Sequence, residues 1–208
     1  MPPPLPPPPF RVEPAGVRWL TPGLRKCKCV LHFIHQTVTS RIQPSDVIIK
    51  VLIGVEKKQP YPYHPERFDC PQLLCRDGLT GRCYWEVERR GEVDISVSYR
   101  VIRWRGKSND CWFGCNDHSW SLTCSDGRYS VCHNNRETSI SSSVSGRVAV
   151  YIDCPAGSLV SSDSLIHLHT FNTTFTQPLY PGFGFWSGSS VSLSPLQDRE
   201  SLLVPQCL

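Results

Sequence analysis

The sequence predicts an all-β fold, an antiparallel β-sandwich with little helix. Two observations support this prediction. Short stretches with alternating apolar and polar residues recur through the second half of the chain, and turn-forming residues separate them. No segment of ten residues shows a helical period. Short alternating strands joined by turns at this spacing are typical of β-sandwiches.

The strands can be placed in order along the chain. Residues 93–99 (VDISVSY) alternate strictly, as expected for a strand with one buried face. The Asp126-Gly127 pair separates two further alternating runs, residues 120–124 and 129–132, and predicts a β-hairpin. The remaining expected strands are residues 26–38, 47–55, 82–88, 146–153, 165–171 and 183–186.

Composition limits the class of protein. The chain has 208 residues, of which 39% are hydrophobic and 19% charged, as in one globular domain of medium size. The net charge of +4 is spread along the chain, whereas nucleic-acid binders concentrate basic residues in a stripe, so no nucleic-acid partner is predicted. No apolar run reaches the roughly 18 residues of a membrane span. Without a signal-peptide pattern, the predicted location is cytoplasmic.

Eleven cysteines are an odd and high number for such a location. Their irregular spacing favours free thiols that act as small buried apolar residues. Cys27, Cys29, His32 and His35 are zinc-ligand residue types, but their spacing fits no standard zinc motif. We therefore predict neither a metal site nor a cofactor.

Two segments are rich in proline. Residues 2–9 are proline except for Leu5, which predicts a polyproline II helix. This tail is either a ligand for an SH3, WW or EVH1 domain or a disordered extension. Residues 59–69 contain three prolines and predict a rigid irregular loop, with Tyr61, Tyr63 and Phe68 packed against the domain.

No catalytic residue is predicted, and the chain is not expected to be an enzyme. The nucleophile motif G-x-S-x-G is absent from the sequence. The Asp117-His118 pair and His133 fall in expected loops, where polar residues are common for solvation alone. Asn172-Thr173-Thr174 is a glycosylation sequence that matters only in a secreted chain.

Five motifs occur in the order found in one known family. They are YPYHPERFD at 61–69, LCRDGLTGRCYWEVE at 74–88, WSL at 120–122, RVAVYID at 147–153 followed by Ala156-Gly157, and FTQPLYPGF at 175–183. Together they resemble the PRY-SPRY (B30.2) domain, which the resemblance places over roughly residues 11–193. The motif sequences are most similar to those of fish domains in tripartite-motif proteins, in NACHT and leucine-rich-repeat receptors, and in stonustoxin-like proteins.

The resemblance implies a bent, jelly-roll-type sandwich and a division of the chain. Residues 1–10 would form the proline-rich tail, residues 11–69 a PRY-like segment that diverges at 27–55, residues 70–193 the SPRY domain, and residues 194–208 a second tail. Trp85, Trp120 and Tyr151 are expected in the core. After Gly157 the chain lacks the aromatic residues of its relatives, so a shortened and weakened strand is expected there.

The resemblance also implies a non-catalytic module that binds a protein partner, in an innate-immune or ubiquitin-ligase setting. The expected binding loops gather on one side of the bent sandwich and are residues 64–69, 103–110, 123–126 and 185–189, with 133–138 as a rim. The predicted contact residues are Arg103, Trp104, Arg105, Lys107, Thr123, Ser125, Phe185 and Trp186. The basic residues around Trp104 suit an acidic or phosphorylated partner. The alternative is a fragment of a secreted stonustoxin-like effector, which disulfides and glycosylation would favour.

Overall fold

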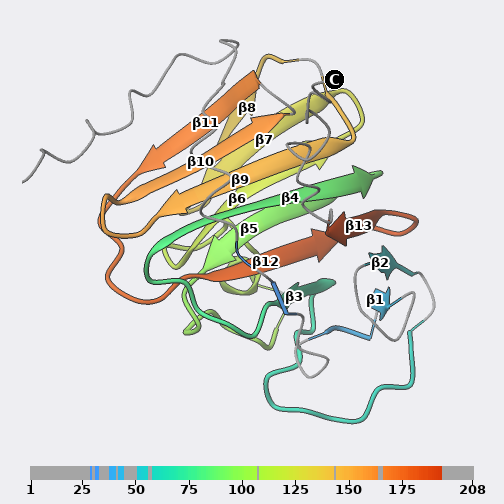
Figure 1. The fold of residues 1–208 in the computed structure, drawn as a ribbon. Coiled ribbons are helices and arrows are strands. Elements are labelled where there is room, and N and C mark those ends of the chain that lie inside the picture. The colour runs from blue at the N-terminus through green and yellow to red at the C-terminus, as the bar shows by residue number, and fades with distance from the viewer. Residues whose placement is uncertain are drawn as a thin grey trace, which may run out of the picture.

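A computed structural model shows two antiparallel sheets packed face to face (Figure 1). The structure describes residues 29, 31–32, 38–40, 42–44, 51–55, 58–106, 108–142, 144–163 and 166–193. Within these ranges the helices and strands of the structure are all strands, apart from one short 3-10 helix, η2 (Asn109–Cys111). The predicted antiparallel β-sandwich with little helix is therefore confirmed.

The first sheet has seven strands, all antiparallel to their neighbours. In spatial order they are β1 (Ile42–Pro44), β2 (Val51–Gly54), β13 (Ser190–Leu193), β4 (Arg82–Arg90), β9 (Arg147–Asp153), β10 (Ser158–Asp163) and β11 (Ile166–Asn172). The expected strands at 82–88, 146–153 and 165–171 correspond to β4, β9 and β11. Residues 194–208 and the proline-rich tail lie outside the described residues, so their assignments stay predictions.

The second sheet has six strands. In spatial order they are β3 (Gln72–Leu74), β12 (Tyr180–Phe185), β5 (Val93–Ser98), β6 (Ser119–Ser125), β7 (Arg128–His133) and β8 (Arg136–Ile140). The hairpin at Asp126-Gly127 is confirmed, because it joins β6 to β7. Asn134 and Asn135 have φ values of 51° and 58° and join β7 to β8, as in a type I′ turn. Most of the expected rim at 133–138 thus belongs to a hairpin.

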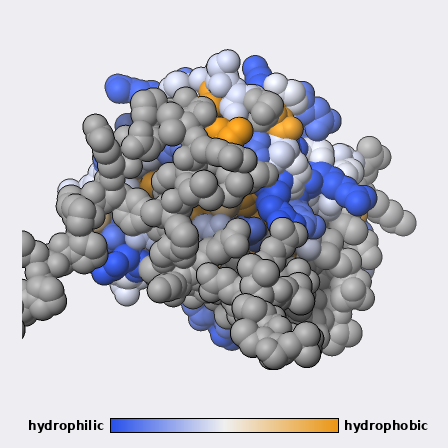
Figure 2. Space-filling view, turned by 45° about the horizontal axis from the view of Figure 1, so that its top comes forward, coloured by the Kyte–Doolittle hydropathy of each residue, from blue (hydrophilic) through white to orange (hydrophobic). Residues whose placement is uncertain are grey.

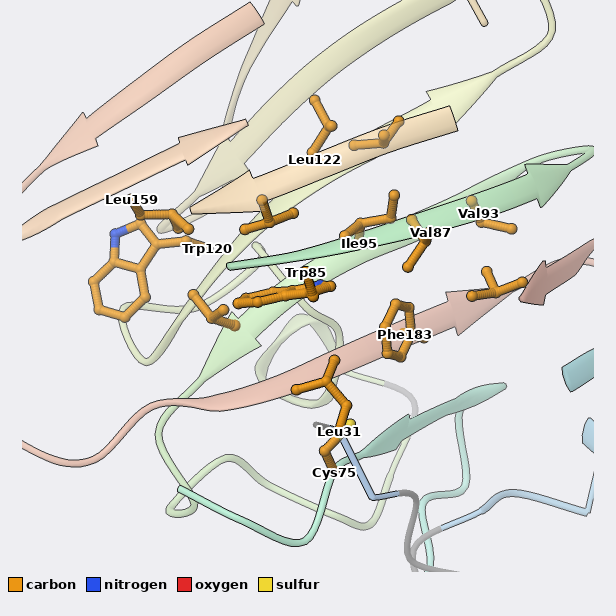
Figure 3. Close-up of a cluster of buried hydrophobic side chains, with 14 of the residues drawn as sticks. Leu31, Cys75, Trp85, Val87, Val93, Ile95, Trp120, Leu122, Leu159 and Phe183 are labelled. Carbon is orange, nitrogen blue, oxygen red and sulfur yellow. The ribbon is translucent and has the colours of Figure 1, made fainter. Parts of the chain in front are cut away.

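The core lies between the two sheets, where alternate residues of facing strands meet (Figure 3). Trp85 on β4 and Trp120 on β6 are 2% and 4% exposed, so their predicted core positions are confirmed. Tyr151 is also buried, but it packs with Tyr84 and Val160 in a separate cluster. Side chains alternate along β9, so Tyr151 lies on the opposite face of the sheet from Val150.

The strand expected to be weakened after Gly157 is fully formed. β10 pairs with β9 along one edge and β11 along the other, and Leu159 enters the core. At its far end, the carboxylate of Asp163 accepts hydrogen bonds from Tyr129 Oη at 2.7 Å and from the Ser145 N–H at 3.0 Å. Main-chain pairing on both sides replaces the missing aromatic packing. A cavity about the size of one water molecule remains beside Ser161.

The cysteines are mostly free, with one exception. Cys29 and Cys83 form a disulfide with a Cα–Cα distance of 5.5 Å, so the prediction of free thiols is wrong for this pair. Seven other cysteines of the described chain are free: Cys70, Cys75, Cys111, Cys115, Cys124, Cys132 and Cys154. Of the zinc-type cluster, Cys27 and His35 lie outside the described residues, and His32 Nδ1 lies 2.7 Å from an oxygen of Asp77. In the described parts of the chain, no helix has the length and apolar character needed to cross a membrane.

Candidate functional site: the Tyr63 surface

Two loops that are distant in sequence lie side by side and form what we call the Tyr63 surface, residues 61–69 and 100–106. The first loop precedes β3, and the second follows β5. The main-chain N–H of Asp69 donates to the carbonyl of Trp104 at 3.1 Å. The structure therefore brings together two of the four expected binding loops, 64–69 and 103–110.

Arg105 connects the two loops. Its Nη1 donates to Asp69 Oδ1 at 2.9 Å and its Nη2 donates to the carbonyl of His64 at 2.8 Å. The Gly106 N–H donates to the other carboxylate oxygen of Asp69 at 3.0 Å. The Gly106 N–H and, to a smaller extent, Arg105 lower the pKa of Asp69. Asp69 therefore keeps its charge, and the connection persists, well into the acidic range.

Arginines also stack on aromatic rings across this surface. Arg100 donates to Glu66 Oε2 at 2.8 Å, and its guanidinium lies 5.8 Å from the ring of Trp104 and 5.4 Å from that of Tyr180. Arg67 lies 5.2 Å from the ring of Tyr61. Such stacking holds a long side chain in one orientation and contributes about 0.5–1 kcal/mol at exposed sites. The arginines are thus ordered before any partner binds.

The surface rests on a small apolar cluster of its own. Phe68 is 1% exposed, and its ring lies 4.5 Å from that of Trp104 and 5.9 Å from that of Phe113. Ile102 completes the buried layer. The expected packing of Phe68 against the domain is confirmed. Trp104 is half-buried on this cluster, so it supports the surface more than it offers an exposed contact.

The side chains of Tyr63, Val101 and Arg103 are among those of the Tyr63 surface that project into solvent. Tyr63 is 82% exposed and Val101 is 56% exposed. The side chain of Arg103 is 69% exposed, with Nη1 3.7 Å from a carboxylate oxygen of Asp110. The prediction that Tyr63 packs against the domain is wrong, because its ring is held outside by Arg105, 4.9 Å above its centroid. Sequence reasoning therefore missed the exposure of Tyr63 and Val101, although the prolines that flank Tyr63 already indicated a rigid loop.

The other expected contact residues lie at the opposite end of β6. Thr123 donates to Asp94 Oδ1 at 2.7 Å, and Ser125 donates to the carbonyl of Arg128 at 3.3 Å. Phe185 is fully buried in the core, so its side chain cannot contact a partner. This residue ends β12, whose inward positions include Phe183. Trp186 is 38% exposed in the turn that follows. Lys107 lies outside the described residues.

Asp94 is the most perturbed carboxyl of this second group. Burial raises its pKa to about 7, although the hydrogen bond from Thr123 acts in the opposite direction. Its side chain lies so close to Gly184 that a methyl group there would approach Oδ2 to 2.8 Å. Asp94 is thus a buried group of the sheet, which Thr123 helps to satisfy.

The rim at 133–138 lies beside the Tyr63 surface. Asn109 Nδ2 donates to Asn135 Oδ1 at 3.3 Å, which links the turn after β7 to the loop after β5. The exposed strand β8 continues from this turn. The rim is therefore connected to the 103–110 loop, which in turn lies beside the 64–69 loop.

Two thiols and one histidine of the described residues are poorly placed for nucleophilic chemistry. Burial raises the pKa of Cys70 to about 12 and that of Cys132 to about 11, so both thiols stay protonated near neutral pH. His118 Nδ1 lies 3.3 Å from its neighbour Asp117, and both side chains are exposed. Neither arrangement forms a nucleophile with an oriented base.

Comparison with known proteins identifies relatives of this domain. No family model matches the chain. The chain is 39% identical over 166 residues to neoverrucotoxin subunit alpha of Synanceia verrucosa, and the match covers 74% of this chain and 23% of that protein. The chain is 34% identical over 158 residues to tripartite motif-containing protein 14 of Mus musculus, and the match covers 71% of this chain and 35% of that protein. The chain thus matches about a quarter to a third of the length of these relatives.

The fold agrees with a solved structure over a complete domain. The crystal structure of the TRIM65 PSpry domain superimposes with a TM-score of 0.77 at 21% identity, covering 88% of this chain and all of that one. The two antiparallel sheets, the order of the motifs and the sequence relatives all indicate the same family. The chain therefore belongs to the PRY-SPRY (B30.2) family of protein-binding domains.

Proposed function

We propose that this domain binds its protein partner through the Tyr63 surface, as a non-catalytic recognition module. The observation that carries the proposal is the set of Arg105 contacts, which join two loops and leave Tyr63 82% exposed above them. Exposed tyrosines with fixed side chains are frequent anchors of binding surfaces, because little conformational entropy is lost on association. A rigid sandwich that presents ordered loops needs no further rearrangement to bind.

The second group of expected contacts supports binding less well. Phe185 is buried, and the hydroxyls of Thr123 and Ser125 already donate hydrogen bonds within the domain. Trp186 alone offers a partly exposed aromatic side chain there. We therefore assign the principal contact to the Tyr63 surface and keep Trp186 as the comparison site.

The setting of this recognition step belongs to the proposal. The PRY-SPRY resemblance favours a cytoplasmic, innate-immune or ubiquitin-ligase assembly, in which the domain would select a protein and another component would act on it. The proline-rich tail would add a ligand for an SH3, WW or EVH1 domain. A peptide of residues 1–10 that fails to bind any such domain on an array would remove the tail from the proposal.

A secreted effector is the second candidate. Two observations favour it: the 39% identity with a toxin subunit and the Cys29–Cys83 disulfide. Thiol labelling of the natural protein distinguishes the settings, because a secreted form would carry the disulfide quantitatively and a cytoplasmic form would expose both thiols on denaturation.

The binding proposal is tested by affinity capture with the full chain as bait. Tyr63→Ala should abolish capture of a partner that the unchanged chain retains, while Trp186→Ala should retain it. Thermal denaturation checks that both variants fold: Tyr63→Ala should keep the unfolding midpoint of the unchanged chain, and Trp186→Ala should lower it somewhat, because that side chain is only 38% exposed. Capture that survives Tyr63→Ala but is lost in a folded Trp186→Ala variant would place the site at the other end of β6.

A further inference from the structure

The Tyr63 surface has an excess of positive charge that its own carboxylates do not balance. The two loops contain four arginines, Arg67, Arg100, Arg103 and Arg105, and two carboxylates, Glu66 and Asp69. This is a formal excess of two positive charges. Both oxygens of Asp69 accept hydrogen bonds from within the surface, and Glu66 pairs with Arg100. The acidic groups are therefore committed to internal contacts.

Arg103 is the most available of these cations. Its side chain is 69% exposed, and its ion pair with Asp110 is long, at 3.7 Å, with Asp110 63% exposed. An exposed pair of this kind contributes at most about 1 kcal/mol, so an incoming carboxylate can replace it at little cost. Arg103 also lies between Val101 and Arg105, within the exposed part of the surface.

The stacked arginines are suited to hold acidic groups. A guanidinium whose face lies on an aromatic ring keeps the donors along its edge, and these match the two oxygens of a carboxylate. Arg100 lies over Trp104 and Tyr180, and Arg105 lies over Tyr63. Figure 2 draws one face of the molecule, on which the coloured residues are mostly hydrophilic or intermediate and the hydrophobic ones form small spots. Within the two loops themselves, the exposed large hydrophobic residues are Tyr63 and Val101. Charge, more than a broad apolar patch, is therefore available for recognition on the Tyr63 surface.

We propose that the partner presents to the Tyr63 surface an acidic protein segment with an apolar or aromatic side chain beside its carboxylates. The carboxylates pair with Arg103, within the positive field of the neighbouring arginines, and the apolar side chain packs on Tyr63 and Val101. This inference rests on the proposed function, because it names the chemistry of the partner for that same site.

The test is selection of binders from a display library of random 12-residue peptides on the full chain. The selected peptides should be rich in aspartate and glutamate and should contain an aromatic or aliphatic residue. Their affinity should fall by roughly tenfold or more in Arg103→Glu, because attraction becomes repulsion. The matched control is Arg76→Glu, since Arg76 is similarly exposed at 62% and also pairs with an aspartate, but lies outside the Tyr63 surface.

The outcomes separate this inference from the proposed function. Acidic peptides lost in Arg103→Glu and Tyr63→Ala but kept in Arg76→Glu support both. If the selected peptides are neutral or basic and their binding is lost in Tyr63→Ala, the proposed site is supported but the acidic partner is contradicted. If binding is unchanged in both variants and depends on Trp186, the proposed site is contradicted as well. A single-stranded RNA that outcompetes the peptides at physiological salt would replace the acidic protein with a nucleic acid.

Discussion

At the turn between β9 and β10, the backbone of Gly157 leaves no room for a side chain. Its φ is +67°, and an added Cβ would lie 1.8 Å from the carbonyl oxygen of Thr173. The Thr173 N–H also donates to the Gly157 carbonyl at 2.8 Å, so the two segments cannot separate without losing this bond. The turn that holds β10 in register therefore depends on glycine.

Gly157→Ala should lower the free energy of unfolding by about 3 kcal/mol or more, because the clash is with main chain in the left-handed region. Urea denaturation of purified protein measures this change. The control is Gly81→Ala, since a Cβ at Gly81 meets no atom within 4 Å. Equal stability of the two variants would show that the close approach is not present in solution.

The buried carboxyl of Asp94 makes a pH-dependent contribution to stability. Its pKa is about 7 in the folded chain, whereas an unfolded aspartate titrates near 3.9. Between these values the folded state binds more protons than the unfolded state, so stability falls as pH rises from about 4 to about 7 and stays reduced above that.

Asp94→Asn removes the titrating carboxyl group and with it the loss of stability at high pH. The free energy of unfolding of the variant, relative to that of the unchanged chain, should therefore be roughly 2–4 kcal/mol higher at pH 8 than at pH 4. Urea denaturation of both proteins at the two pH values gives the difference. If the two proteins show the same pH dependence, Asp94 is ionised at little cost in the folded domain.

At the scale of elements, the order of the two loops depends on the geometry of Arg105 as well as its charge. Arg105→Lys keeps the positive charge but replaces the planar fork, whose two nitrogens bond Asp69 and the His64 carbonyl, with a single ammonium nitrogen. Amide hydrogen exchange in residues 61–69 should accelerate by about tenfold, which corresponds to about 1.4 kcal/mol. Arg103→Lys is the control and should leave exchange unchanged, since among the described residues Arg103 forms an ion pair with Asp110 alone, at 3.7 Å. Equal exchange in both variants would contradict the role given to Arg105.

The strands that could be predicted are those whose side chains alternate. β5 and the β6–β7 hairpin follow from apolar periodicity and the Asp126-Gly127 turn. β8 could not be predicted, because Arg136–Ser139 are all exposed and only main-chain pairing with β7 defines the strand. β10 was underestimated for a related reason: pairing along both edges holds a strand whose side chains are mostly small.

The candidate site was predictable only in part. The loops were located by the family resemblance, and two of them meet. The contact between Asp69 and Arg105 spans 36 residues, so no local pattern reveals it. The family resemblance places Phe185 in a binding loop, although the residue also falls within the expected strand 183–186; β12 ends at Phe185, and its ring is buried in the core. Tyr63 is expected to pack against the domain because it is aromatic, whereas its ring is exposed beneath the guanidinium of Arg105.

At the scale of the whole molecule, the sandwich separates two groups of surface loops. The loop after β5 enters β6 at Ser119, and the hairpin with Thr123 and Ser125 leaves it at the other end. Seven residues of strand span roughly 20 Å, so a footprint centred on one end can be distinguished from a footprint centred on the other. The rigid sheets between them make the domain a scaffold in which each group can be tested alone.

The most direct test of the account is hydrogen exchange of the full chain with and without its captured protein partner. Binding through the Tyr63 surface predicts slower exchange in residues 61–69 and 100–106, with no change at 123–128 and 186–189. Protection confined to 123–128 and 186–189, with 61–69 and 100–106 unaffected, would contradict the central claim.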